Sequence, residues 1–237
     1  LNTHHDISMS KDKEPVYWNN KLFRQFKLFE VSRYANLFEK NRKIKGESTT
    51  SYMYYDSFIS NIKANFEYSP KFIFVLRNPV DRYISHVNWL KGLGLEKKDV
   101  NQVINEDDWA NFSEYDDYPK QYYQFGLYNK WITRFIKNFG KKNIKIITFE
   151  QLISDRLKTL NSCYEFLGVE KVDNLKFIRS NKSKKIIFPF IYHFLRKSSV
   201  GKTKCTKIVK YVLPKKIREK IKGLLKYTLQ NWIAVES

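Results

Sequence analysis

The clearest pattern in the chain is an apolar run over residues 72–76 that ends abruptly in polar sequence. The run is short and partly β-branched, which is typical of a strand buried on both faces in a parallel sheet. An Arg-Asn-Pro sequence follows it. Its proline, Pro79, disfavours helical geometry at the preceding residue and is itself well placed to begin a helix. The pattern therefore predicts a buried strand over 72–76 and then a helix over 79–92.

Strand-like and helical periods alternate along the rest of the chain. Residues before about 13 and those of the acidic stretch 93–119 show neither period and are predicted to be irregular. The other predicted elements are a short strand at 44–46, a helix over 53–66, a helix over 120–139, a strand over 144–149, and a helix over 157–167 stopped by Gly168. Strands that alternate with helices predict one α/β domain, spanning 1–237, with a largely parallel sheet.

Composition adds a strong positive charge to this picture. The 237 residues are 42% hydrophobic and 16% aromatic, as expected of a folding chain, and the net charge is +20. Such a charge attracts polyanions: nucleic acid, anionic lipid, acidic polysaccharide or a nucleotide. The charge is concentrated in 171–232, which holds 18 Lys or Arg against two acidic residues. Because no nucleic-acid recognition motif accompanies it, nucleic acid is disfavoured.

Residues 171–237 are predicted to form a basic, mainly helical part of the domain. Over 215–232, apolar residues fall on one helical face and lysines lie opposite. Two interpretations stay open: a terminal helix with a solvated basic face, or a helix that contacts an anionic surface peripherally. No apolar run approaches the roughly 20 residues that span a bilayer. A cytoplasmic location is expected, with the Golgi lumen as the alternative if an N-terminal anchor has been removed.

Candidate binding chemistry lies where the first predicted strand ends. Arg77 follows the strand directly, and Ser85 lies about two turns into the next helix. Ligands of open α/β sheets bind at the carboxyl ends of strands. A forked guanidinium and a hydroxyl at such a place suit a dianionic phosphate.

This segment resembles the 3′-phosphate-binding segment of sulfotransferases that use 3′-phosphoadenosine 5′-phosphosulfate (PAPS). The resemblance to the glycan-type members of the family extends over 13–168. Its further elements are Lys13-Glu14-Pro15, the Gly46-Glu47 turn with Thr49 and Tyr52, Gly126 with Tyr128, Glu150 with Leu152, and Phe166-Leu167-Gly168. It implies a P-loop-NTPase-like three-layer sandwich with a central parallel sheet. It also implies sulfuryl transfer from PAPS, with PAP as product and no metal, to a hydroxyl or amine of a carbohydrate.

The resemblance also implies roles for individual residues. Glu14 is expected to be the general base, shielded by neighbouring aromatic side chains, while Arg77 and Ser85 hold the 3′-phosphate. Lys13, Glu47 and Tyr128 are expected at the acceptor side. A basic loop is expected to complete the cofactor site with Arg179, Ser180, Asn181 and Lys182. His4 and His5, in a polar stretch, are expected to be exposed and to bind no metal.

One family element has no counterpart in the sequence. The Pro-Lys-Ser/Thr-Gly-Thr-Thr loop, which holds the 5′-phosphosulfate at a helix N-terminus, should precede Lys13 but does not occur there. We therefore expect the fold to be N-terminally incomplete in this chain. Two alternatives to a carbohydrate sulfotransferase stay open. One is a basic polyanion- or glycan-binding module with a decayed cofactor site, and the other is a PAPS enzyme acting on lipid or protein tyrosine.

Overall fold

A computed structural model of the chain describes residues 1–18, 31–92, 95–106 and 120–174. The chain divides into two compact units. The first consists of Leu1–Tyr83 and Asp107–Phe177, and the second of Ile84–Glu106 and Ile178–Ser237. The boundary falls inside one helix, α3, which spans Pro79–Gly92 as the sequence predicts.

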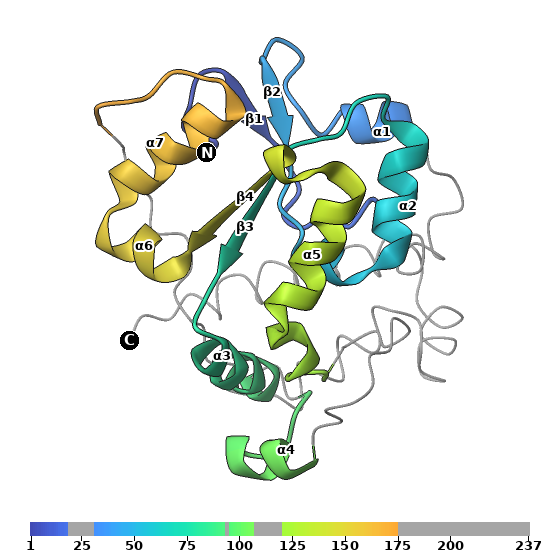
Figure 1. Cartoon of the computed structure of the whole chain (residues 1–237), viewed down its shortest axis with the longest axis vertical. Helices are drawn as coiled ribbons and strands as arrows, with labels where there is room; N and C mark the ends of the chain where they lie inside the picture. Colours follow the sequence, from blue (N-terminus) through green and yellow to red (C-terminus); the bar gives the residue numbers. More distant parts are fainter. Residues whose placement is uncertain (19–30, 93–94, 107–119, 175–237) are drawn as a thin grey trace, which may run out of the picture. The chain divides into compact units, whose positions relative to one another are not determined.

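The four strands in the described part of the first unit form two parallel pairs (Figure 1). Strand β1 (Ile7–Met9) pairs with β2 (Ile44–Gly46), and β3 (Phe72–Leu76) pairs with β4 (Ile144–Thr148) in register from one end to the other. The strands predicted at 44–46, 72–76 and 144–149 are therefore confirmed. Strand β1 lies in sequence predicted to be irregular, and this prediction is wrong. Three residues are too few to show a period, and they form a strand because they pair with β2.

Within the first unit, helices and 3-10 turns connect and cover these strands (Figure 1). In the first unit they are α1 (Val31–Ala35), η1 (Thr50–Tyr54), α2 (Asp56–Asn65), η2 (Gln124–Gly126), α5 (Tyr128–Phe139), η3 (Lys141–Asn143), α6 (Phe149–Ser154) and α7 (Arg156–Leu167). In the second unit, besides its part of α3, the described helix is α4 (Val100–Glu106).

Three details differ from the sequence prediction. Helix α4 forms inside the acidic stretch expected to be irregular, and α5 begins at Tyr128 rather than at 120, after the separate turn η2. Strand β3 is only partly buried, and 53% of Val75 is exposed. A five-residue apolar run indicates a strand, but its burial depends on what packs on each face.

One core cluster of the first unit is mostly aromatic and is formed by side chains of α2, η1 and α5, with Trp18 and Tyr55, packed against β3 and β4. Its buried members are Trp18, Tyr52, Tyr55, Phe58, Ile59, Ile62, Phe135 and Phe139. Phe135 is 1% exposed, and its ring meets those of Phe72 and Phe74 edge-on at 5.2 and 5.0 Å between centroids. Edge-to-face packing of this kind adds to the burial of apolar area and fixes α5 against the sheet.

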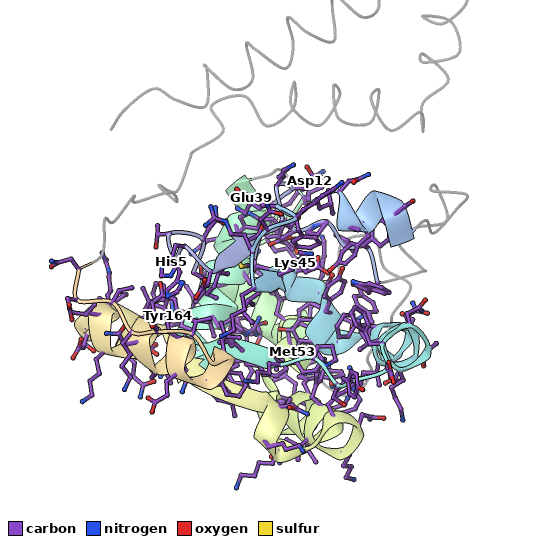
Figure 2. The ribbon with its side chains drawn as sticks, turned by 90° about the horizontal axis from the view of Figure 1, so that it is seen from above. His5, Asp12, Glu39, Lys45, Met53 and Tyr164 are labelled. Carbon is purple, nitrogen blue, oxygen red and sulfur yellow. The ribbon has the colours of Figure 1, made fainter. Side chains whose placement is uncertain are left out.

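Helices α6 and α7 cover β4 on the other side (Figure 1). Thr148 caps α6 in a reciprocal capping box with Gln151, and Asp155 accepts the Lys158 N–H at 3.0 Å to cap α7. Gly168 ends α7 with φ 82°, a conformation that favours glycine. Tyr164 of α7, labelled in Figure 2, is fully buried, and it packs in one core cluster with Ile7 of β1. The predicted helix over 157–167 and its stop are confirmed.

Among the helices in the described part of the chain, none is long and apolar enough to cross a membrane. The predicted helix over 215–232 lies outside the described residues.

Candidate functional site

Arg77 lies directly after β3, at its carboxyl end, where β3 and β4 run parallel and side by side. Its side chain is 38% exposed. The guanidinium lies 5.5 Å from the centre of the Phe149 ring and has a long ion-pair contact, 3.9 Å, with the Asp81 carboxylate. Arg77 thus lies at a strand end, beside an aromatic ring, and its guanidinium is accessible to solvent. An anion can therefore reach it.

The peptide unit between Arg77 and Asn78 is hydrogen-bonded on both sides. The Tyr128 hydroxyl, from the first turn of α5, donates to the Arg77 carbonyl oxygen at 3.0 Å. The Glu150 carboxylate, from the first turn of α6, accepts the Asn78 N–H at 3.1 Å. We call these two contacts the Arg77–Asn78 clamp. Since two separate helices hold one peptide plane, the direction in which Arg77 leaves the backbone is fixed.

Ionisation of the two clamp residues follows from these contacts. The N–H of Asn78 stabilises the charged form of Glu150 and lowers the pKa of that carboxyl, with a smaller effect from Arg77. Burial raises the pKa of the Tyr128 hydroxyl, so it stays protonated and able to donate.

The turn continues into α3 through Asn78. Its side-chain oxygen accepts the N–H groups of Val80 at 2.9 Å and Asp81 at 3.4 Å, which caps the helix. Ser85 lies in α3, within the second unit, and is exposed. Its helical setting agrees with the sequence, while its role at a phosphate stays a prediction.

Arg82, in the first turn of α3, supports the turn that leads into this helix. Its guanidinium donates to the Tyr122 carbonyl oxygen, just before η2. Gly126 lies against the same guanidinium: a Cβ at this position would be 3.4 Å from Nη2 of Arg82. The arginine therefore joins the start of α3 to the segment that leads into α5.

Glu14, the expected base, lies in an exposed turn with Lys13. Glu14 and Val16 both have positive φ, 51° and 54°, on either side of Pro15. Each such residue costs on the order of 1–3 kcal/mol, so neighbouring contacts must hold this turn. The expected shielding of Glu14 by aromatic neighbours is not found, because Trp18 is 3% exposed and packs into the core instead.

Glu47 follows β2 and is surrounded by hydroxyl groups. Tyr34 donates to its carboxylate at 2.9 Å, Tyr52 at 3.1 Å and Thr49 at 3.3 Å. Burial raises the pKa of the Glu47 carboxyl, and the three hydroxyls oppose that shift. Burial, and to a smaller extent the charge of Glu47, raises the pKa of Tyr34 and Tyr52, which keeps both hydroxyls as donors.

The comparison with protein families shows to which family this chain belongs. Residues 2–232 match the family of the sulfotransferase domain. The chain belongs to the sulfotransferase family. It is accordingly a sulfotransferase enzyme, as the resemblance of its motifs implies. None of the curated proteins matches it.

One of two similar solved structures supports the sulfotransferase fold. A sulfotransferase from Alicyclobacillus acidocaldarius superposes with a TM-score of 0.63 at 22% identity, over 77% of this chain and 78% of that one. The sulfotransferase domain from the curacin biosynthetic pathway has a TM-score of 0.38 at 18% identity, over 64% of this chain and 44% of its own. The first likeness confirms the predicted α/β, P-loop-like fold.

In this sulfotransferase the structure places only some of the predicted site residues together. Arg77 and Tyr128 meet at the clamp, and Glu47 lies with the segment that carries Glu14. Arg179, Ser180, Asn181 and Lys182 lie outside the described residues. Sequence reasoning assigns Glu150 no role. The signal that could have found it is its position two residues after the end of β4, because carboxyl ends of adjacent parallel strands meet at one edge.

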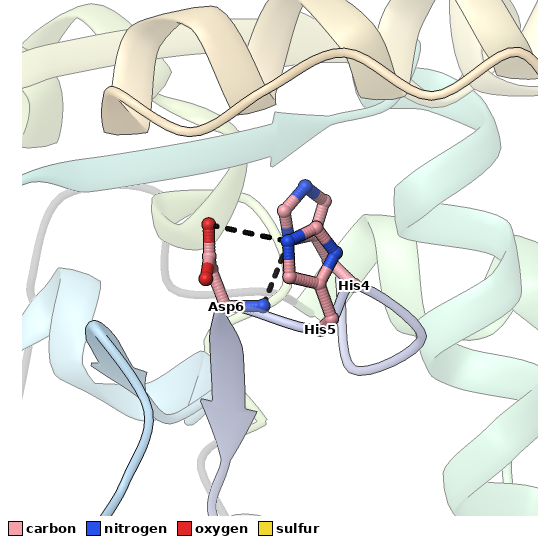
Figure 3. A group of neighbouring side chains, drawn as sticks. All are labelled: His4, His5 and Asp6. Carbon is pink, nitrogen blue, oxygen red and sulfur yellow. Dashed lines mark hydrogen bonds and ion pairs between the residues drawn. The ribbon is translucent and has the colours of Figure 1, made fainter.

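His4, His5 and Asp6 form the one group of possible metal ligands among the described residues, with ligand atoms within 4.8 Å of one another (Figure 3). His4 is buried, at 3% exposure, which corrects the expectation that it is exposed; His5 is exposed. Nδ1 of His4 accepts the Asp6 N–H at 3.1 Å, so Nε2 carries the proton and donates to the Glu170 carbonyl at 3.0 Å. Both ring nitrogens of His4 are thus engaged in hydrogen bonds. His4 has no lone pair left for a metal, so the three residues do not fit a metal site.

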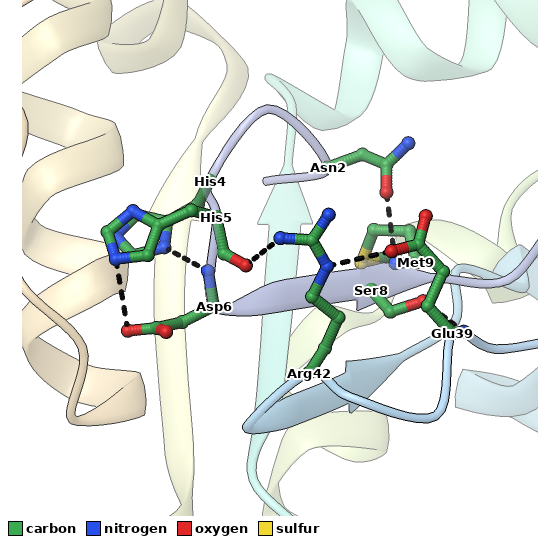
Figure 4. A network of polar contacts seen from close by, with 8 residues as sticks. All are labelled: Asn2, His4, His5, Asp6, Ser8, Met9, Glu39 and Arg42. Atoms are coloured by element: carbon green, nitrogen blue, oxygen red, sulfur yellow. Dashed lines mark hydrogen bonds and ion pairs between the residues drawn. The ribbon is translucent and has the colours of Figure 1, made fainter.

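The segment that carries His4 and His5 instead connects β1 to the chain before β2 through polar contacts (Figure 4). Arg42 donates to the His5 carbonyl and to the Glu39 carboxylate, the latter at 2.7 Å. The Glu39 N–H in turn donates to the Ser8 hydroxyl at 2.9 Å. These contacts hold β1 and the loop before it against the segment that enters β2.

Proposed function

We propose that this sulfotransferase transfers the sulfuryl group of PAPS to a hydroxyl or amine of a carbohydrate. Arg77 binds the 3′-phosphate, and the observation that carries the proposal is its position at the carboxyl end of β3, fixed by the clamp. A planar guanidinium forms paired, charge-assisted hydrogen bonds with a phosphate. The sequence assigns Ser85 to the same phosphate, and Arg179, Ser180, Asn181 and Lys182 to the remaining cofactor contacts.

Glu14 is the proposed base. Its carboxylate takes the proton of the acceptor while the acceptor atom bonds to sulfur and the bond from sulfur to the departing phosphate oxygen of PAP breaks. The exposed position of Glu14 supports this role, because a large acceptor can reach an exposed carboxylate. Lys13 beside it supplies positive charge, and the basic composition of the chain favours an acidic carbohydrate.

Nucleotide binding tests the cofactor assignment. We expect isothermal titration calorimetry to show that the chain binds PAP more tightly than adenosine 5′-phosphate, which lacks the 3′-phosphate. Arg77→Ala should weaken PAP binding roughly 10- to 100-fold, as expected for hydrogen bonds to a charged group, and remove this preference. Lys141→Ala, which removes an exposed positive charge elsewhere, is the matched control. Equal binding of the two nucleotides by the unaltered chain would contradict the assignment.

The acceptor is tested separately with radiolabelled PAPS and a panel of unsulfated polysaccharides, glycolipids and tyrosine peptides. We expect label in a polysaccharide, and its loss in Glu14→Gln with PAP binding unchanged. Label in a lipid or peptide alone would reject the carbohydrate assignment. Salt-dependent binding of polysaccharide without any PAP binding would favour the polyanion-binding alternative.

A further inference from the structure

The Glu47 carboxylate is connected to the backbone of the segment that carries Glu14. Two of the hydroxyls that donate to Glu47 also accept backbone N–H groups: the Thr49 hydroxyl lies 3.4 Å from the Val16 nitrogen, and the Tyr52 hydroxyl lies 3.1 Å from the Trp18 nitrogen. Each relay runs from a backbone N–H through one hydroxyl to the same carboxylate.

The direction of both relays depends on the charge of Glu47. An ionised carboxylate only accepts hydrogen bonds, so each hydroxyl must turn its single proton toward Glu47. The lone pairs of Thr49 and Tyr52 are then left facing the backbone N–H groups. An amide at position 47 would donate as well as accept, and a hydroxyl that accepted from it would no longer be held in this orientation.

The segment that these relays hold needs such support. Glu14 and Val16 have positive φ, which an unsupported β-branched residue such as Val16 rarely adopts. Beyond them, Trp18 is anchored in the core, and its carbonyl accepts from the Asn61 side chain at 2.8 Å. The two relays therefore lie between a strained, exposed turn and a fixed aromatic side chain.

We propose that Glu47 is a positioning residue: through the hydroxyls of Thr49 and Tyr52 it holds the backbone of residues 13–18 in the conformation that presents Glu14. The assignment of Glu14 as the base rests on the proposed function, whereas the mechanical link to residues 13–18 does not. Glu47 is then not a group that contacts the acceptor, because its oxygens are engaged by three hydroxyls.

Amide hydrogen exchange at Val16 and Trp18, measured by NMR on the full chain, tests the link. We expect Glu47→Gln to speed exchange at both amides. Thr49→Val should speed exchange at Val16 about fivefold, the effect of one lost hydrogen bond, while Thr49→Ser, which keeps the hydroxyl, restores the original rate. Tyr52→Phe should act in the same way at Trp18.

Two controls separate positioning from general loosening. Glu67→Gln makes the same chemical change at an exposed carboxylate. Tyr34→Phe removes a Glu47 contact that reaches the segment through the side chains of Tyr17 and Trp18 and not through a backbone N–H. Neither should alter exchange at Val16, and PAP affinity should be the same in all these variants. If Glu47→Gln misfolds, the comparison of Thr49→Val with Thr49→Ser tests the link to residues 13–18 by itself.

Unchanged exchange at Val16 in Thr49→Val, or equal effects of Thr49→Val and Thr49→Ser, would overturn the inference. A failure of the proposed function looks different. Faster exchange at Val16 in Thr49→Val, together with full sulfuryl transfer by Glu14→Gln, would leave the link intact and reject Glu14 as the base.

Discussion

The Tyr128 hydroxyl donates to the carbonyl oxygen of Arg77 at 3.0 Å, across 51 positions of the chain. The contact places a side chain from α5 on the backbone of the residue that we assign to the cofactor phosphate. This hydrogen bond and the one from the Asn78 N–H to Glu150 hold the backbone between β3 and α3, and so they fix the position from which the guanidinium extends. Preorganisation of this kind favours binding, because the protein does not lose the ordering entropy when the ligand arrives.

Tyr128→Phe should weaken PAP binding roughly threefold to tenfold, the usual worth of one neutral hydrogen bond. The ring and its packing are retained, so the change reports on the hydroxyl. Calorimetry with PAP measures the effect, and Tyr68→Phe, at a side chain that is 79% exposed, is the control. Unaltered PAP affinity in Tyr128→Phe would show that the clamp does not serve binding.

Glu150→Gln should make the stability of the chain less dependent on pH. The folded pKa of Glu150 is depressed by the Asn78 N–H, so its ionised form adds stability above the unfolded pKa of about 4.3, and this stability is lost as pH falls through the folded pKa. Glutamine keeps the acceptor oxygen but not the charge. Melting temperatures should therefore be higher for the unaltered chain at pH 7 and converge with those of Glu150→Gln in acid. Glu67→Gln makes the same chemical change at an exposed carboxylate and is the control. An equal dependence of melting temperature on pH in the Glu150→Gln variant and the unaltered chain would contradict the contribution of Glu150.

Asn78→Ala should destabilise the chain by about 1 kcal/mol, because it leaves the first N–H groups of α3 without their cap. Asn78→Ser supplies another capping oxygen and should recover most of the loss. Urea unfolding measures both variants. Equal stability of the alanine and serine variants would mean that the Asn78 side chain does not cap α3.

Phe135→Ala should cost about 3–5 kcal/mol, since it opens a cavity among the aromatic rings that join α5 to β3. Ile153→Ala, at a side chain that is 56% exposed, should stay within about 0.5 kcal/mol. The two free energies of unfolding come from the same urea titration. A small effect at Phe135 would contradict the packing of α5 on the sheet.

Local signals in the sequence predict the elements that carry the cofactor chemistry. Apolar runs indicate β3 and β4, Pro79 marks the start of α3, and Gly168 marks the end of α7. Arg77 could be placed at a strand end for the same reason. Prediction fails for β1, which needs β2 beside it, and for α4, whose three apolar residues, Val100, Val103 and Ile104, give too short a helical period to stand out within an acidic stretch.

Local sequence rules suffice to predict that Arg77 follows a strand and that a helix begins at Pro79, because steric limits at proline and runs of apolar residues act over a few neighbouring positions. The contacts that hold Arg77 and the Glu14 segment arise from the folding of distant parts of the chain onto one another. Tyr128 and Glu150 reach Arg77 and Asn78, and Glu47 reaches Val16 through Thr49, across long stretches of chain. Such contacts exist only once parallel strands have aligned their carboxyl ends and α5 has packed on the sheet, so no local pattern encodes them.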